Sequence, residues 1–262
     1  MPLASDRIAA YAAELDEAER TRSPIGPLTV REPDLTADDA YRIQLAWMDM
    51  RKARGERVVG KKIGLTSHAM QKMLGVFEPD YGHVLDTMVI PPGEPVKLDE
   101  LLQPKVEGEL AFILDRDLPP PCTVLDVLLA TRLVVPALEI VDSRIADWKI
   151  KLPDTVADNA SSGRVVLADR GMRPDQLDLT VVGMIFERNG EMLSCGAGAA
   201  VLGNPAAAVA WLANKLAQFG IQLKAGEVIL SGAVTAAVEA RPGDLFTARF
   251  GCGLGSVSAR FE

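Results

Sequence analysis

The sequence contains few of the side chains that most often bind zinc or form disulfides. Its 262 residues include only two histidines, His68 and His83, so a histidine-rich zinc site is excluded. The three cysteines, Cys122, Cys195 and Cys252, lie far apart and are odd in number, which indicates reduced thiols in a cytoplasmic protein. The patterns G-x-S-x-G, C-x-x-C and H-E-x-x-H are also absent. We therefore expect none of the serine-hydrolase, dithiol or zinc-protease sites.

Long apolar runs and an excess of basic charge are missing as well. No apolar stretch reaches the roughly 18 residues that a membrane-spanning helix needs. The N-terminal segment reads MPLASDRIAAYAAELDEAER and lacks the charged-then-apolar order of a signal peptide. The formal net charge of −8 argues against nucleic acid as a partner, since phosphate binding needs a basic patch. These absences predict a cytoplasmic protein that acts on a small molecule, without membrane or nucleic-acid partners.

The patterns along the chain predict a helical start and a β-rich remainder. Apolar residues recur at helical spacing over residues 1–55, and Thr36 with Asp39 three residues on predicts the start of a helix. Beyond that point many short strands alternate with glycine and proline turns, and Asn189-Gly190 predicts a hairpin. This arrangement favours an α+β fold with a mixed β-rich core. We expect a helical segment, residues 1–55, packed on a catalytic body, residues 56–262.

One apolar strand carries two glutamates on the same face. Residues 103–114 read QPKVEGELAFIL, and side chains alternate along a strand, so Glu107 and Glu109 point the same way, about 7 Å apart at the backbone. Two neighbouring carboxylates on a half-buried sheet repel each other and lose hydration. A positive partner is therefore expected beside them. Gly108, on the opposite face, is expected to leave room for close packing behind the pair.

A third glutamate interrupts the apolar strand VVPALEIVDS. Glu139 in this strand is expected either to pair with an arginine, for which Arg144 is close in sequence, or to join the first pair as a metal ligand. Oxygen-only ligand sets are those that Mg²⁺ and Mn²⁺ prefer. A divalent cation would also offset the repulsion between the first two glutamates. The three carboxylates together support the hypothesis of a divalent-metal site, which the E-x-E spacing alone does not support.

Two further segments offer polar groups with open roles. The strand KKIGLTS places Lys61 and Lys62 before a glycine, either as solvated edge charges or as lysines near a metal. Desolvation and a nearby cation would both lower the pKa of such a lysine toward neutrality. Asp80 in EPDYG is expected on a turn. The glycine-rich run GCGLGS leads into an alternating strand, so it predicts a hairpin loop rather than a phosphate site.

Taken together and in order, these segments resemble one family. From about residue 24 to the C-terminus the chain is similar to the 2-hydroxypenta-2,4-dienoate hydratases (2-keto-4-pentenoate hydratases) of meta-cleavage pathways, in the fumarylacetoacetate hydrolase superfamily. The segments that carry the resemblance are KKIGLTS, EPDYG, PKVEGELAFIL, VVPALEIVDSRIADWKIK, DTVADNASSG, GAGAAVLGNP, AVAWLANKLAQFG and LKAGEVILSG.

The resemblance implies a role for five of the residues. Glu107, Glu109 and Glu139 match the family's metal ligands, so Mg²⁺ or Mn²⁺ is the implied cofactor. Lys62 matches its catalytic lysine, and Asp80 matches a proposed acid–base aspartate. The implied reaction begins with a dienol carboxylate, whose far carbon takes a proton. Water then adds at C4 and a proton at C3, which yields a 4-hydroxy-2-oxo acid.

The resemblance also implies a substrate pocket, a fold and an assembly. Ser161, Thr235 and Leu65 match positions that line the pocket. The implied fold is a rolled mixed β-sheet core with a helical N-terminal part, and the implied assembly is a homo-oligomer. Association with the next pathway enzyme or with a sister decarboxylase is a further implied partnership.

Three alternatives stay open at the level of sequence. In the sister family, 4-oxalocrotonate decarboxylase, the substrate is a diacid, so the pocket should hold a cation from a residue such as Arg144, Lys149 or Lys151. The segments GAVTAAVEARPGD and GLGSVSARF look closer to that sister, whereas SRIADWKIKLPDTVADNAS looks closer to the hydratases. An acylpyruvate C–C hydrolase would need a His–Glu pair, and neither histidine lies in a matching motif. A non-catalytic partner subunit is the third alternative. The substituent on the dienoate is not legible in the sequence.

Overall fold

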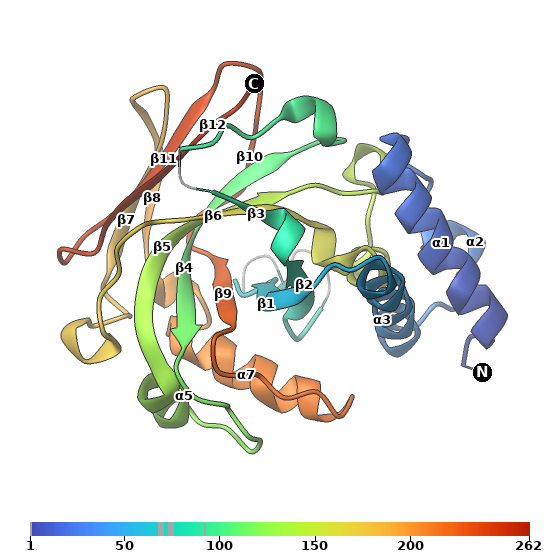
Figure 1. Cartoon of the computed structure of the whole chain (residues 1–262), viewed down its shortest axis with the longest axis horizontal. Helices are drawn as coiled ribbons and strands as arrows, with labels where there is room; N and C mark the ends of the chain where they lie inside the picture. The colour runs from blue at the N-terminus through green and yellow to red at the C-terminus, as the bar shows by residue number, and fades with distance from the viewer. Residues whose placement is uncertain (1, 68–70, 73–75, 92) are drawn as a thin grey trace.

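The first part of the chain is helical. The computed structural model describes residues 2–67, 71–72, 76–91 and 93–262. Helix α1 spans Ser5–Thr21, α2 Leu28–Arg31 and α3 Ala37–Ala53, and α1 packs against α3 at one end of the molecule (Figure 1). Thr36 caps α3 by accepting a hydrogen bond from the Asp39 backbone N–H, as the sequence predicts.

The helical part is tied to the rest of the chain through a buried amide. Gln44 of α3 donates from Nε2 to the carbonyl of Tyr81 at 2.9 Å and to that of Val156 at 2.8 Å. Helix α3 also packs against α6, Leu152–Ala157. The division into residues 1–55 and 56–262 stays a prediction.

A curved mixed sheet forms the centre of the molecule. Within the described residues it has eight strands, in the order β2-β1-β9-β4-β5-β6-β3, with β10 paired to β4. The pairs β1–β9 and β3–β6 are parallel and the others are antiparallel. The strands are β1 (Val58–Gly64), β2 (Asp80–Leu85), β3 (Val89–Ile90), β4 (Lys105–Leu114), β5 (Thr131–Val141), β6 (Ser162–Leu167), β9 (Val228–Ala233) and β10 (Val238–Glu239).

A second, four-stranded sheet packs against β4 and β5, at the upper left of Figure 1. Its order is β12-β11-β7-β8, and the hairpin between β7 and β8 turns at Asn189-Gly190, as predicted. Residues 251–254 form the loop between β11 and β12, which confirms the hairpin interpretation of GCGLGS. The strands are β7 (Gly183–Arg188), β8 (Glu191–Ala197), β11 (Leu245–Phe250) and β12 (Gly255–Arg260).

The close approach of the two sheets explains Gly108. A Cβ built on this residue would lie 2.4 Å from Met184 Sδ and 3.2 Å from the Ala248 Cβ, both from the second sheet. A side chain there would force the Met184 side chain to move and would crowd Ala248. Gly108 therefore permits close packing behind the two glutamates, as expected from the strand's alternation.

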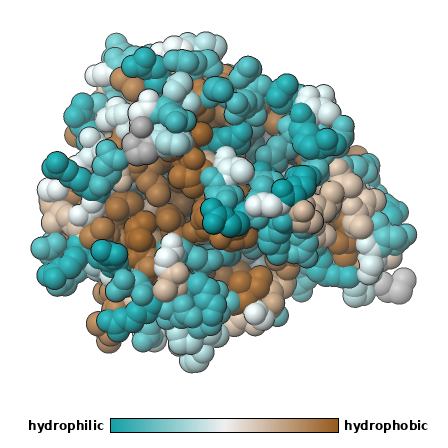
Figure 2. All heavy atoms as spheres, viewed as in Figure 1, coloured by the Kyte–Doolittle hydropathy of each residue, from teal (hydrophilic) through white to brown (hydrophobic). Residues whose placement is uncertain are grey.

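Helices α5 (Val124–Ala130) and α7 (Pro205–Ala217) pack against each other below the sheet in Figure 1. Apolar side chains gather on the visible face of the molecule over the region of β4, β5 and β9 (Figure 2). A small apolar cluster comes from the same sheet, with members such as Ala111, Val135 and Leu230. None of the helices in the described ranges has both the length and the apolar character needed to cross a membrane. The mixed rolled sheet with added helices confirms the predicted α+β class.

Candidate functional site

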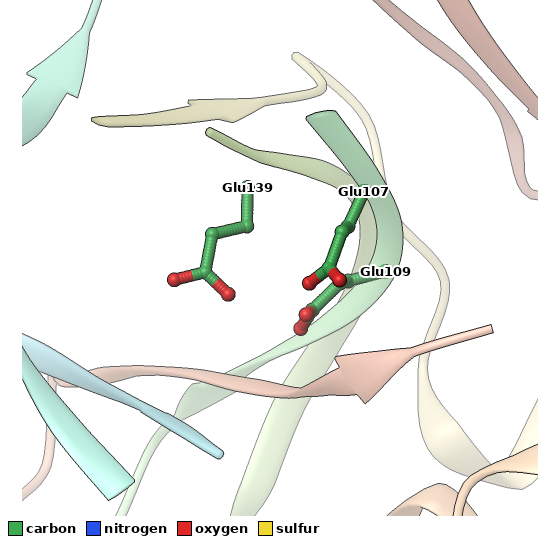
Figure 3. Close-up of side chains that lie close together, drawn as sticks. All are labelled: Glu107, Glu109 and Glu139. Atoms are coloured by element: carbon green, nitrogen blue, oxygen red, sulfur yellow. The ribbon is translucent and has the colours of Figure 1, made fainter. Parts of the chain in front are cut away.

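Three glutamates meet on one face of the long β4–β5 pair. The antiparallel register places Glu139 of β5 directly opposite Glu107 of β4, with Glu109 two residues further along β4. One carboxylate oxygen from each residue lies within 4.8 Å of the others. Figure 3 shows the three side chains pointing into the same space. Glu109 and Glu139 are buried and Glu107 is half-buried, so the cluster lies inside the molecule.

This cluster carries more negative charge than its surroundings neutralise. Burial, followed by the charge of Glu139, raises the pKa of Glu107 to about 7. The same causes, with the charge of Glu107 added, raise the pKa of Glu109 above its ordinary value. Glu109 Oε2 accepts a hydrogen bond from the Gly232 backbone N–H at 2.9 Å. Within the described residues, Glu109 Oε1 and both Glu139 carboxylate oxygens have no hydrogen-bond partner.

Buried oxygens without partners are costly unless something binds them. Three converging carboxylates match the oxygen ligand sets of Mg²⁺ and similar hard divalent cations, which usually keep further positions for water or substrate. The residues present therefore fit a divalent cation, and the arrangement is a candidate metal centre.

Arg144 does not serve as the positive partner of Glu139. Its guanidinium is buried and forms an ion pair with Asp158 from Nε, while Nη1 donates to the Ser162 carbonyl at 2.9 Å. The arginine alternative for Glu139 is therefore wrong.

Lys62 is the cation that lies beside the cluster. Strand β1 lies between β2 and β9, so the expectation of solvated edge lysines is wrong, and both Lys61 and Lys62 are buried. Lys62 Nζ lies 3.3 Å from Glu139 Oε2 as an ion pair without hydrogen-bond geometry, and it donates to the Ala160 carbonyl at 3.0 Å. Lys61 pairs with Glu227 at 2.8 Å instead. Of these two adjacent lysines, Lys62 therefore lies at the glutamate cluster and Lys61 does not.

The pKa of Lys62 depends on the carboxylates that surround it. Burial alone would lower the pKa of this ammonium, but the charges of Glu139, Asp80 and the two β4 glutamates outweigh burial and raise it. The predicted lowering of this pKa applies to a lysine beside a bound cation, and it stays a prediction. A bound cation would offset the same carboxylates that raise this pKa.

Asp80 is the first residue of β2 and lies opposite Gly64 of β1, so the predicted turn position is wrong. Burial raises the pKa of its carboxyl, the charge of Lys62 opposes that rise, and the charge of Glu139 adds to it. A Cβ built on Gly64 would lie 2.2 Å from Asp80 Oδ1 and 3.4 Å from Lys62 Nζ. Asp80 and Lys62 therefore flank the same point, which only a glycine leaves open.

A left-handed turn holds the carbonyl that Lys62 contacts. Asn159, Ala160 and Ser161 have φ values of 53°, 50° and 54°, a conformation that is costly for residues other than glycine. The Asn159 side chain secures the turn, because Oδ1 accepts from the His83 N–H at 2.7 Å and Nδ2 donates to the His83 carbonyl at 2.9 Å. Sequence reasoning missed this carbonyl. The one available signal was asparagine, which tolerates left-handed backbone.

A cavity of about 540 Å³ opens beside the cluster and is lined in part by Glu107, Leu65, Thr66 and Thr235. Thr235 Oγ1 is buried and, among the described residues, has no hydrogen-bond partner. Ser161 is not among the residues lining this cavity, and its Oγ lies 3.3 Å from Asp158 Oδ2. The structure thus brings Leu65 and Thr235 to the cavity and places the Ser161 hydroxyl against Asp158.

Comparison with known proteins identifies the class to which this fold and site belong. Residues 57–262 match the family described as fumarylacetoacetate (FAA) hydrolase C-terminal, and the chain belongs to that family. The predicted superfamily is confirmed.

Two named hydratases and one solved structure are similar to the chain over most of its length. The chain is 55% identical over 210 residues to a 2-hydroxypent-2,4-dienoate hydratase of Pseudomonas putida, covering 79% of this chain and 95% of that protein. It is 51% identical to a 2-keto-4-pentenoate hydratase of Paraburkholderia xenovorans, covering 96% and 93% respectively. Among solved structures, 4-oxalocrotonate decarboxylase from Pseudomonas putida G7, complexed with magnesium and adipate, superposes with a TM-score of 0.96 at 41% identity, over 99% of both chains.

The metal hypothesis makes a prediction about stability. Mg²⁺ at 100 times its dissociation constant should raise the free energy of unfolding by about 2.7 kcal/mol. Glu109→Gln should lose most of this gain. Without metal, the variant should be at least as stable as the parent, because one of the repelling charges is gone. Chemical denaturation with and without Mg²⁺ measures both effects.

Glu187→Gln is the matched control, because it removes one negative charge from β7 of the second sheet, where Glu187 pairs with Arg249. It should keep the full stabilisation by Mg²⁺. Equal stabilisation of Glu109→Gln and the parent protein would contradict the assignment of Glu109 as a metal ligand.

Proposed function

We propose that the protein is a metal-dependent hydro-lyase that adds water to 2-hydroxypenta-2,4-dienoate, or to a substituted analogue, to give a 4-hydroxy-2-oxo acid. The observation that carries this proposal is the arrangement of Glu107, Glu109 and Glu139 around one space, with Lys62 and Asp80 beside them. Relatives of at least 50% identity that are named as hydratases of this substrate class support it.

We assign the three glutamates as ligands of Mg²⁺, with Mn²⁺ as the alternative. Oxygen-only ligands suit both ions, and the magnesium in the related decarboxylase structure favours the first. When bound, the cation would hold the substrate's carboxylate and 2-oxygen and stabilise negative charge on that oxygen as a Lewis acid.

Lys62 and Asp80 are the groups that we propose to move protons. One proton must be delivered to C5 of the dienol, and the 2-hydroxyl proton must be removed, which gives the conjugated 2-oxo-3-enoate. The oxygen of water then bonds to C4 while C3 takes a proton, so the net reaction is addition of one water molecule. The raised pKa of Asp80, caused first by burial, favours its neutral and proton-donating form. Lys62 is held as a cation by the surrounding carboxylates.

Leu65 and Thr235 would contact the substrate, since both line the cavity that Glu107 borders. The Ser161 hydroxyl would not contact the substrate. It would instead hold Asp158 and the left-handed turn, whose Ala160 carbonyl accepts a hydrogen bond from Lys62. This arrangement makes the turn a support for the lysine rather than a wall of the pocket.

Decarboxylation of 4-oxalocrotonate is the second candidate, favoured by the likeness to the solved decarboxylase. Of the cations considered for a second carboxylate, Arg144 is buried against Asp158, and Lys149 is exposed and pairs with Asp147. Neither of these residues, nor Lys151, lines the cavity beside the cluster.

The C–C hydrolase alternative has little support from the histidines. His83 is buried, with Nδ1 3.0 Å from Gln44 Oε1, and burial lowers its pKa well below the ordinary value. His68 lies outside the described residues.

The assembly is also a proposal. Partly exposed apolar side chains lie beside the small cluster on the central sheet, among them Val59, Val228 and Leu133. Burying such a face against a second copy would remove apolar surface from water. We therefore propose a homo-oligomer, and we also propose that it associates with a neighbouring pathway enzyme or with a sister decarboxylase.

The proposed reaction is tested by direct assay. Purified protein with Mg²⁺ should consume freshly prepared 2-hydroxypenta-2,4-dienoate, seen as loss of the dienol absorbance, and EDTA should abolish the turnover until excess Mg²⁺ is restored. A parallel incubation with 4-oxalocrotonate should release little CO₂. Absence of metal-dependent turnover would overturn the proposal, and rapid CO₂ release would favour the decarboxylase instead.

The adjacent lysines provide a matched pair of variants. Lys62→Met should lower kcat by about 10²–10⁴-fold, the usual contribution of a positioned acid–base group. Lys61→Met breaks the pair with Glu227, so it should lower stability but leave kcat near the parent value. Steady-state kinetics with circular dichroism on both proteins measures this contrast. A Lys62→Met protein with near-normal kcat would remove Lys62 from the mechanism.

A further inference from the structure

Strand β2 has an edge that no other strand covers in the part of the chain that the structure describes. It pairs with β1 alone, at one end of the eight-stranded sheet. Tyr81 and His83 are alternate residues of β2, and alternate residues of an antiparallel pair direct their backbone groups away from the partner strand. Three such groups, the Tyr81 carbonyl and the N–H and carbonyl of His83, are bonded to side-chain amides. Two amides therefore cover this edge in place of a strand.

Asn159 binds His83 as a neighbouring strand would. Its Oδ1 accepts from the His83 N–H at 2.7 Å, and its Nδ2 donates to the His83 carbonyl at 2.9 Å. One carboxamide thus satisfies both backbone groups of a buried residue. Asn159 itself is buried, and its left-handed φ of 53° begins the turn over residues 159–161. The bonds of the side chain consequently fix the backbone of the turn.

The turn lies directly against β2 at the point opposite Lys62. Gly82 pairs with Lys62 in the β1–β2 register, and a Cβ built on Gly82 would lie 2.3 Å from the Asn159 carbonyl oxygen. The next carbonyl of the turn, that of Ala160, accepts the hydrogen bond from Lys62 Nζ at 3.0 Å. A shift of the turn relative to β2 would therefore move the acceptor that locates the lysine.

Gln44 makes a second connection between the same two segments. Its Nε2 donates to the Tyr81 carbonyl of β2 at 2.9 Å and to the Val156 carbonyl at 2.8 Å. Val156 lies in the last turn of α6, where carbonyls lack partners within the helix. Gln44 Oε1 lies 3.0 Å from His83 Nδ1. Helix α3, which carries Gln44, precedes the part of the chain that matches the family model, so the support of the turn comes partly from outside that region.

We propose that Asn159 and Gln44 are positioning residues of the site, which fasten the turn with the Ala160 carbonyl to β2 and so hold Lys62 in place. This inference rests on the proposed function, in which Lys62 and Asp80 move protons. Asp80 is the first residue of β2, so the same bonds fix the separation between its carboxyl and the lysine ammonium. Neither amide is among the residues that line the cavity beside the cluster, so both act through the lysine and not on the substrate.

The test combines Asn159→Gly with Lys62→Met. Glycine adopts left-handed backbone readily, so Asn159→Gly removes both bonds to His83 and still permits the turn. Its kcat on 2-hydroxypenta-2,4-dienoate with saturating Mg²⁺ should fall by about 10²-fold, the effect of a misplacement of about 1 Å, while KM stays near the parent value. In the Lys62→Met protein the same change should lower kcat no further, because residues that act as one unit are not additive.

Asn189→Gly is the matched control. Asn189 has a φ of 56°, and its side chain also accepts one hydrogen bond, from the Leu245 N–H at 2.8 Å, and donates one, to Asp244 at 3.0 Å. This residue lies at the β7–β8 turn of the second sheet, so the variant should keep the kcat of the parent. Gln44→Met should lower kcat at unchanged KM, and again not in the Lys62→Met protein. Either of Asn159→Gly and Gln44→Met decides the question if circular dichroism shows that the other does not fold.

A normal kcat in a folded Asn159→Gly or Gln44→Met protein would overturn the inference. So would a loss of the same size in the Lys62→Met background, or failure of both variants to fold, since each would leave the amides with a purely structural role. Turnover by the parent separates these results from failure of the proposed function. A parent protein that does not hydrate the dienol would overturn both proposals.

Discussion

The repulsion among three carboxylates on one buried sheet face is the constraint on which the rest of this site depends. Glu107, Glu109 and Glu139 converge in a space that Asp80 also borders, and Lys62 is the cation paired with that cluster. One ammonium cannot satisfy so many carboxylate oxygens, several of which have no partner among the described residues. A divalent cation bound there would resolve the imbalance and would also offer positions for substrate oxygens.

The surrounding fold is arranged around that cluster. The antiparallel β4–β5 register sets Glu139 across from Glu107, and the second sheet comes close behind through Gly108. Gly64 leaves the space that Asp80 and Lys62 flank, while the turn fastened by Asn159 presents a carbonyl to the lysine. Costly local conformations therefore collect next to the site, as expected where function imposes geometry that packing must hold.

Some of this could be read from the sequence and some could not. Alternation along a strand is local, so the shared face of Glu107 and Glu109 was predictable, as was the packing at Gly108. The position of Glu139 opposite Glu107 depends on pairing between distant segments, which spacing does not contain. The pairing of Arg144 with Asp158, which excludes Arg144 as the partner of Glu139, likewise depends on the fold of the segment between them.

The central claim is that the three glutamates bind one divalent cation, and diffraction from crystals containing Mn²⁺ tests it most directly. Data collected at the manganese absorption edge should show one strong anomalous peak among these side chains, bonded to an oxygen of each of Glu107, Glu109 and Glu139. Lys62 Nζ should then no longer lie within ion-pair distance of the oxygen of Glu139 that binds the metal. Crystals saturated with Mn²⁺ that show no peak at this position would contradict the account.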